Sequence, residues 1–183
     1  MEELRIRLDI ANDLYDVVHL SGHAGHEKDL GSVFYTEDEL GGLHRATADE
    51  IFQNLNGKRR PTLLFFQGVV RGGAAEAGRL PSLSEALVKK GIPFVAGWAQ
   101  PVYDFTATTG AAHLYKQLSR GESIPRAMRE ATVAMLQDAV KYPDWHLLRL
   151  YAATAKDESL IVPGRHIVPL RSHFDQFLMP IDK

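Results

Sequence analysis

Three short apolar segments, spread over the first hundred residues, constrain the fold of this chain more than any other feature. They cover residues 16–20, 62–66 and 92–99 and are rich in the β-branched and aromatic side chains that favour strands. The second segment is almost wholly apolar, as expected for a strand that is buried on both faces. The first two run into glycine-containing turns, at Gly22 and Gly68.

Helix signals occupy the two intervals between these strands. Thr47 and Glu50 have the spacing of a capping box, and so have Ser82 and Glu85. Gly91 follows the second expected helix, in the position where a glycine commonly ends one. Strands that alternate with helices in this way form parallel sheets joined by right-handed crossovers. The sequence therefore predicts an α/β fold with a mostly parallel central sheet.

The other segments carry weaker patterns. Residues 3–12 fit either a strand or a helix, and we favour a helix. We also expect, in chain order, a small edge strand over residues 31–38, helices over residues 104–119 and 123–140, a strand over residues 145–152 and a hairpin after residue 159. No repeat or linker is evident, so we expect a single domain over residues 1–183.

Composition limits the partners and the compartment that we expect. The formal net charge is −2 and no long run of like charges occurs, so we expect no nucleic-acid partner. Apolar stretches of membrane-spanning length and a secretory signal are both absent, so we expect no membrane partner and a cytoplasmic location. The glycine-rich residues 71–79 lack the order of a phosphate-binding loop, and we expect no cofactor.

His23 and Val69 directly follow the turns at the ends of two predicted strands. Both would lie at the carboxyl edge of a parallel sheet, where ligands bind in α/β proteins. They are 46 residues apart, about the length of one strand-helix-strand crossover, so we expect their strands to be neighbours. Between Gly22 and Ala24, His23 would act as a general base while backbone N–H groups stay accessible. A surface histidine without a catalytic role is the alternative.

Three histidines, His19, His23 and His26, allow another interpretation. Their spacings of four and three residues fit a metal site on a helix, but Gly22 and Gly25 favour a turn. We therefore expect no metal site, and a zinc-dependent hydrolase is kept only as a separate hypothesis.

Four ordered segments of the sequence resemble one known family. They read YDVVHLSGHAG, TLLFFQGVVRGG, LVKKGIPFVAGWAQPVYD and LYKQLSRGESIPRAMREA, and the likeness extends over residues 15–153. Together they resemble the CHAT domain, a caspase-like group of cysteine peptidases. The resemblance implies a caspase-like three-layer sandwich and a protein or peptide substrate. It also implies a regulatory repeat domain as a partner, because members are often joined to such repeats.

In that family a strand-end histidine and a cysteine form a catalytic dyad. The resemblance implies that His23 is the base, that Val69 occupies the nucleophile position and that the N–H groups of Ala24 and Val69 line the oxyanion hole. Valine cannot form a thiolate, and the chain contains no cysteine. We therefore expect an endopeptidase domain that is inactive in this form, through natural loss or engineering. A non-catalytic domain that binds peptides or serves as a scaffold is the alternative.

The resemblance bears on two more regions. In the caspase-like clan, the region of Trp98, Tyr103 and Asp104 helps to form the pocket for the substrate residue before the scissile bond, where Asp104 would select Lys or Arg. We favour Asp104 as a helix N-cap, and leave Trp98 and Tyr103 between pocket and core.

Related domains also carry a strand and helix before the segment that matches residues 1–14. A partner chain or residues 4–10 would supply the strand, or the sequence is part of a larger polypeptide.

Overall fold

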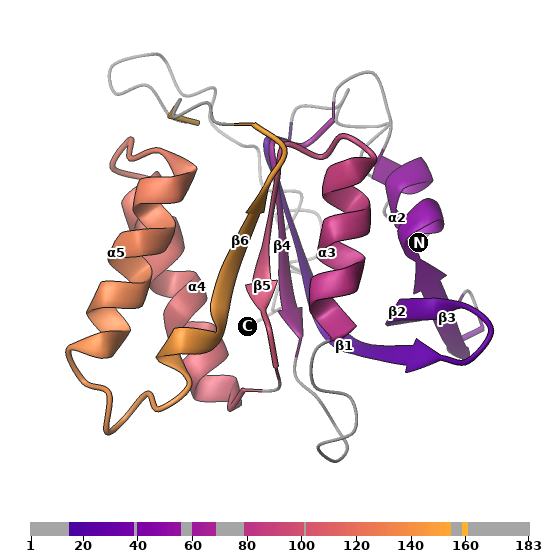
Figure 1. The fold of residues 1–183 in the computed structure, drawn as a ribbon, viewed down its shortest axis with the longest axis horizontal. Helices are drawn as coiled ribbons and strands as arrows, with labels where there is room; N and C mark the ends of the chain where they lie inside the picture. The colour runs from indigo at the N-terminus through magenta and orange to yellow at the C-terminus, as the bar shows by residue number, and fades with distance from the viewer. Residues whose placement is uncertain are drawn as a thin grey trace, which may run out of the picture.

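The structure is a computed structural model that describes residues 15–38, 40–55, 60–68, 79–100, 102–154 and 159–160. Its elements are, in chain order, β1 (Val17–Glu27), β2 (Gly31–Glu37), β3 (Leu43–Thr47), α2 (Ala48–Leu55), β4 (Leu63–Gly68), α3 (Arg79–Lys89), β5 (Phe94–Trp98), α4 (Asp104–Leu118), α5 (Ile124–Leu136), the short 3-10 helix η2 (Trp145–Leu147) and β6 (Leu148–Ala152). The strands form one sheet in the order β3-β2-β1-β4-β5-β6 (Figure 1).

The core of this sheet is parallel, as the alternation of strands and helices predicts. β1 pairs in parallel with β4, and β4 pairs in parallel with β5. The outer strands run the other way, because β2, β3 and β6 each join the sheet through antiparallel pairing. The prediction of an α/β fold with a parallel core is therefore confirmed, and antiparallel strands extend the sheet at both sides.

Helices cover both faces of the sheet, which gives three layers (Figure 1). One hydrophobic cluster packs α2 and α3 against one face, and a second packs α4 and α5 against the other. β4 contributes to both clusters: Leu64 and Phe66 face α2 and α3, while Leu63 and Phe65 face α4 and α5. All four side chains have no exposed surface, and each such burial stabilises the fold by about 1.5–3 kcal/mol. The layers and the central sheet therefore confirm the prediction of a caspase-like three-layer sandwich.

β1 is longer than the sequence predicts, and the expected turn at Gly22 is wrong. The strand continues through His23 to Glu27, where it pairs with β2 instead of β4. The two glycines that suggested a turn have a packing role. A Cβ at Gly22 would lie 2.9 Å from the ring of Phe34, and a Cβ at Gly25 would overlap the ring of Tyr35. Glycine therefore allows aromatic rings from β2 to lie over β1.

Several boundaries also differ from expectation. β2 is a strand as expected, but it lies inside the sheet because β3 takes the edge. Helix α3 begins at Arg79, so Ser82 lies within the helix and cannot cap it. Pro81 falls in the first turn of α3, where the missing N–H group has no helical partner to lose. Helix α5 ends at Leu136, four residues before the expected end, and η2 replaces the beginning of the last strand.

Two other expectations about helix ends, the Thr47 cap of α2 and the glycine after α3, are confirmed. The Glu50 N–H group donates a hydrogen bond of 3.3 Å to Thr47 Oγ1, so Thr47 caps α2. The Glu50 side chain contacts His44 Nε2 at 2.5 Å. Gly91 follows α3 with a φ of 105°, and Gly121 follows α4 with a φ of 86°, a backbone conformation that favours glycine. Residues 3–12 and the tail beyond residue 160 lie outside the described residues.

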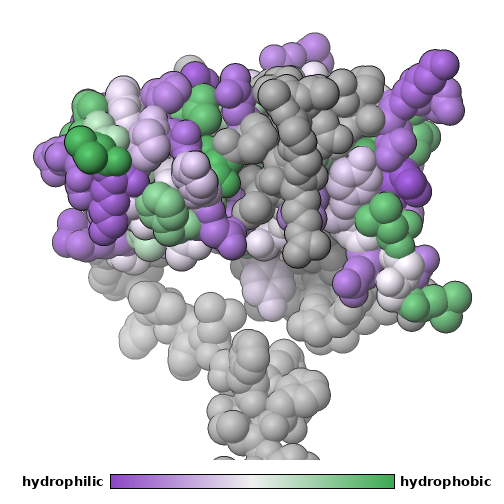
Figure 2. Space-filling model, turned by 90° about the horizontal axis from the view of Figure 1, so that it is seen from below, coloured by the Kyte–Doolittle hydropathy of each residue, from purple (hydrophilic) through white to green (hydrophobic). Residues whose placement is uncertain are grey.

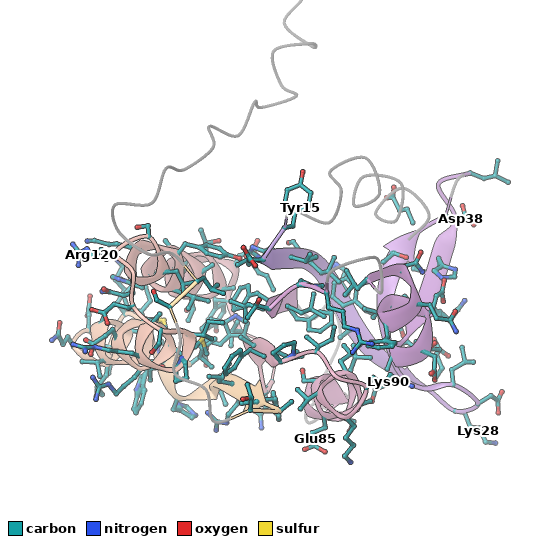
Figure 3. All side chains as sticks on the ribbon, turned by 90° about the horizontal axis from the view of Figure 1, so that it is seen from above. Tyr15, Lys28, Asp38, Glu85, Lys90 and Arg120 are labelled. Atoms are coloured by element: carbon teal, nitrogen blue, oxygen red, sulfur yellow. The ribbon has the colours of Figure 1, made fainter. Side chains whose placement is uncertain are left out.

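Among the described residues, no helix is both long enough and apolar enough to cross a membrane. Charged side chains lie around the outside of the molecule, as the labels of Figure 3 show for Lys28 and Asp38 near the ends of β2, Lys90 at the end of α3 and Arg120 beyond α4. Tyr15 precedes β1 and points away from the sheet (Figure 3). It is 39% exposed.

Candidate active site

The parallel register brings His23 next to the end of β4. The last pair of this register joins Gly22 to Gly68, so His23 is the first residue of β1 beyond it. Val69 follows Gly68 in the chain but lies outside the described residues. The expectation that the strands before these two positions are neighbours is confirmed. The strand-helix-strand crossover behind it contains the β2-β3 hairpin as well as α2.

Strand alternation assigns the residues around this point to the two faces of the sheet. Val18 and Ala24 of β1 belong to the cluster on the α2 and α3 face. His19 contacts Phe65 and Tyr115, which lie on the α4 and α5 face. Ser21 and His23 follow His19 at intervals of two residues, and so share its face. On β4, Gln67 shares this face because it is two residues beyond Phe65.

His23 is also bordered by the β2-β3 hairpin. Tyr35 lies opposite His23 in the antiparallel register, so their side chains emerge from the same face of the sheet. The Tyr35 hydroxyl donates to Glu27 Oε1 at 3.1 Å, and Arg45 Nε donates to the same oxygen at 2.8 Å. His23 is partly buried and lies on β1 between the end of β4 and a polar, aromatic stretch of the hairpin.

The backbone beyond Gly22 has one unusual property. In the described part of the chain, the stretch from His23 to Glu27 pairs with β2 on one side only, because β4 ends at Gly68. Ala24 lies in this stretch, opposite Phe34, and its side chain is 6% exposed. The sequence predicts that a turn leaves backbone N–H groups accessible here, but Ala24 lies in a strand and not in a turn. The strand edge on the β4 side offers backbone groups without a described ladder partner.

A polar contact behind this edge escaped the sequence analysis. His19 Nδ1 lies 2.9 Å from the Tyr115 hydroxyl of α4. Burial lowers the pKa of His19 below its usual 6.5, and a hydrogen bond with the side chain of Gln67 opposes this shift. Burial also raises the pKa of Tyr115 to about 12. The alternation of His19, Ser21 and His23 was visible in the sequence, but Tyr115 is 96 residues away and no local pattern pairs it with His19.

The segment after β5 separates the three expected pocket residues. Trp98 is 1% exposed and packs in the core, where its ring lies over Gly110 of α4. Tyr103 is 65% exposed and stacks on Phe105, with 5.7 Å between ring centroids. Tyr103 also takes the N-cap position of α4, so the expectation that Asp104 is the N-cap is wrong. Asp104 is the first residue of the helix and favours it through the helix dipole.

The ends of β4 and β5 and the beginning of α4 reach the same edge of the molecule. β4 and β5 both end at the lower edge in Figure 1, where α4 begins. Figure 2 views this edge from below, with hydrophilic and hydrophobic side chains intermixed on the half formed by α4 and α5. Asp104 and Tyr103 are therefore at the carboxyl edge of the parallel strands, as the sequence predicts, whereas Trp98 is in the core.

The alternative of a histidine metal site gains no support from the geometry. His19 and His23 are separated by four residues of extended strand, about 13 Å, which is too far for two ligands of one ion. Among the residues that the structure describes, no group of three or more His, Cys, Asp or Glu side chains is arranged to hold a metal ion.

Comparison with known proteins gives one finding about the family. The family model of the CHAT domain matches residues 2–158, which is most of the chain. No curated protein was found to match it. The match covers the whole parallel core, the strand that carries His23 and the segment that contains Val69. The chain therefore belongs to the CHAT domain family, a family of caspase-like cysteine peptidases.

Proposed function

We propose that this chain is a cysteine endopeptidase domain of the His/Cys dyad type that is inactive in this form. His23 holds the place of the general base, and Val69 holds the place of the nucleophile. The oxyanion hole is formed by the N–H groups of Ala24 and residue 69. Asp104 and Tyr103 border the site at the beginning of α4, where they would contact a peptide. Protein or peptide is the substrate class.

The observation that carries this proposal is the register of β1 and β4. Gly22 and Gly68 are paired, and the residues that follow them in the chain are His23 and Val69. Consecutive Cα atoms are about 3.8 Å apart, which limits how far either residue can lie from the glycine pair. Along β4, Phe65 and Gln67 share the His23 face. Each of the two dyad positions is thus one peptide bond beyond a glycine of this pair.

The edge of β1 beyond the Gly22–Gly68 pair supports the proposed role of the Ala24 N–H group in the oxyanion hole. A backbone N–H group that is not part of a ladder can donate to the oxygen of a tetrahedral intermediate. The part of β1 that contains Ala24 has such an edge on the β4 side in the described residues. An extended peptide could also pair with this edge, since unpaired strands commonly bind peptides in this way.

In this proposal, the chemistry is blocked at position 69. With cysteine there, His23 would accept the thiol proton, and the thiolate would attack the scissile carbonyl carbon. The amine would leave with the proton from the imidazolium, and water would then hydrolyse the thioester to the acid and free thiol. The isopropyl group of Val69 has no proton to give and no lone pair, so none of these steps can begin.

Restoring the nucleophile tests the proposal. Val69→Cys is expected to create cleavage of a broad peptide library, detected by mass spectrometry, and His23→Ala in the same background is expected to abolish it. Val70→Cys is the matched control, because it adds the same thiol one residue later in a chain without other cysteines. Cleavage that survives His23→Ala, or equal cleavage by the two cysteine variants, would contradict the dyad. A folded Val69→Cys variant without any cleavage would contradict endopeptidase function.

The second candidate is a peptide-binding domain that does not cleave. The valine and the exposed aromatic pair Tyr103 and Phe105 favour it, because both suit binding and neither suits catalysis. It predicts that the unmodified protein retains peptides from the same library, and that Val69→Cys leaves both retention and peptide integrity unchanged. Cleavage by Val69→Cys would decide against it.

A further inference from the structure

Arg45, on the edge strand β3, is held in place by a carboxylate from β1. Its Nε donates to Glu27 Oε1 at 2.8 Å, and the Tyr35 hydroxyl of β2 donates to the same oxygen at 3.1 Å. Lys28, which follows Glu27 in the chain, marks this end of β1 in Figure 3. Side chains from three neighbouring strands therefore meet here, and the contact with Glu27 orients the guanidinium group of Arg45.

This contact leaves most of the hydrogen-bonding capacity of Arg45 unused. A guanidinium group has five N–H donors, and Glu27 accepts from only the one on Nε. Among the described residues, neither Nη1 nor Nη2 of Arg45 donates a hydrogen bond. The Arg45 side chain is also 45% exposed. Because two adjacent Nη groups match the two oxygens of a carboxylate, Arg45 has both the orientation and the donors to bind a second one.

The guanidinium group belongs to the face of the sheet that carries His23. Arg45 lies opposite Tyr35 in the β2-β3 register, and Tyr35 lies opposite His23 in the β1-β2 register, so all three side chains emerge from one face. Glu27 is four residues beyond His23 on β1, which corresponds to about 13 Å. Between them, β1 has no ladder partner on its β4 side in the described residues. An extended peptide paired there would reach from His23 to the Arg45 guanidinium in about four residues.

We propose that Arg45 is a specificity-determining residue, which binds the carboxylate of an Asp or Glu side chain in the substrate, about four residues from the scissile bond. The inference rests on the proposed function, because that function places the scissile bond beside His23. A role in fold stability alone explains the geometry less well. Exposed ion pairs contribute little to stability, and a lysine would neutralise Glu27 equally well. A lysine lacks the planar pair of donors that remains after the contact with Glu27.

The negative charge of Glu27 is compatible with a second carboxylate at Arg45. Its Oε1 accepts two hydrogen bonds, so its charge is shared between the Tyr35 hydroxyl and the guanidinium. The donors of a guanidinium also point in different directions, and the edge formed by Nη1 and Nη2 is distinct from the Nε–H group. A substrate carboxylate at that edge would therefore not have to displace Glu27.

Matched peptide libraries test this preference in the unmodified protein, where no cleavage is needed. Each library has one fixed position, either Glu or Gln, and random residues other than Asp and Glu elsewhere. The carboxyl terminus is amidated, so that no other carboxylate is present. With the fixed residue at the correct distance, peptides with Glu should be retained about fivefold better than those with Gln, as measured by mass spectrometry.

Three variants assign the preference to one side chain. Arg45→Gln should abolish it and leave retention of the Gln peptides unchanged. Arg45→Lys should keep only part of it, because lysine retains the charge without the planar pair of donors. Arg126→Gln is the matched control, since Arg126 Nε also contacts a glutamate oxygen, Glu122 Oε2 at 2.9 Å, but on α5. It should leave the preference unchanged, and circular dichroism checks that each variant is folded.

Equal retention of Glu and Gln peptides by the unmodified protein, or retention of neither, would overturn the proposal. So would a preference that survives in Arg45→Gln, remains complete in Arg45→Lys or disappears in Arg126→Gln. Failure of the proposed function has a different signature: Val69→Cys would cleave no peptide, while the preference that depends on Arg45 remains. Conversely, equal cleavage of Glu and Gln peptides by Val69→Cys would leave the proposed function standing and remove the role of Arg45.

Discussion

Gly22→Ala tests why a glycine stands beside His23. The added Cβ would lie 2.9 Å from Cζ and 3.1 Å from Cε1 of Phe34. Carbon atoms prefer about 3.5–4.0 Å, so the ring would have to move by about half an ångström or more. Phe34 is 2% exposed and its centroid is 5.2 Å from that of Phe66, so close packing opposes the movement. We expect unfolding free energy to fall by about 1–3 kcal/mol, measured by urea denaturation with an unchanged m-value.

A second substitution separates packing from backbone strain. Phe34→Leu shortens the side chain that meets the new Cβ, so the double variant should recover part of the loss, with a coupling of about 1 kcal/mol. Gly31→Ala is the control, because Gly31 has a φ of 75° and nothing within 4 Å of an added Cβ. It should cost about 1 kcal/mol through strain, and Phe34→Leu should not relieve it. A stable Gly22→Ala variant, or a loss that Phe34→Leu leaves untouched, would refute the packing explanation.

Three further predictions address other parts of the fold. Gly110→Ala would bring a Cβ to 2.8 Å from Trp98 Cζ2, so urea denaturation should show a loss of about 1–3 kcal/mol, and an unchanged midpoint would contradict the contact. Thr47→Ala removes the acceptor of the Glu50 N–H group and should cost about 1 kcal/mol, which Thr47→Ser should largely restore. Burial raises the pKa of Tyr115 from 10.0 to about 12, so its contribution to stability is complete below pH 10 and is lost as the pH rises towards 12. Thermal melts should therefore show that Tyr115→Phe loses less stability than the unmodified protein in this interval, and equal losses would argue against burial of the hydroxyl.

The parallel core could be predicted because its signals are local. β4 is a short apolar run, and such a run is typical of a strand that is covered by helices on both sides. The Thr47 cap marks the beginning of α2 within the sequence itself. The order of β1, β4 and β5 agrees with helix-containing crossovers between neighbouring parallel strands. These features depend on residues that are close in the chain.

The rest depends on contacts between distant residues. Gly22 and Gly25 have the composition of a turn, and only the rings of β2 that lie over them reveal an extended strand. Ser82 has the spacing of a capping residue, but α3 begins earlier, at Arg79, and takes Ser82 into its interior. For the site, the neighbourhood of His23 and Gly68 could be predicted from crossover length. The contact of His19 with Tyr115 could not, because α4 is placed by its packing on the sheet.

The pH dependence of thiol alkylation in the Val69→Cys variant tests the central claim most directly. Because the chain has no other cysteine, the whole signal comes from position 69. If His23 is next to this position, its positive charge should stabilise the thiolate and lower the thiol pKa below the ordinary value of about 8.5. His23→Ala should then return the pKa to about 8.5. A pKa near 8.5 that is the same with and without His23 would contradict the claim that these two positions meet.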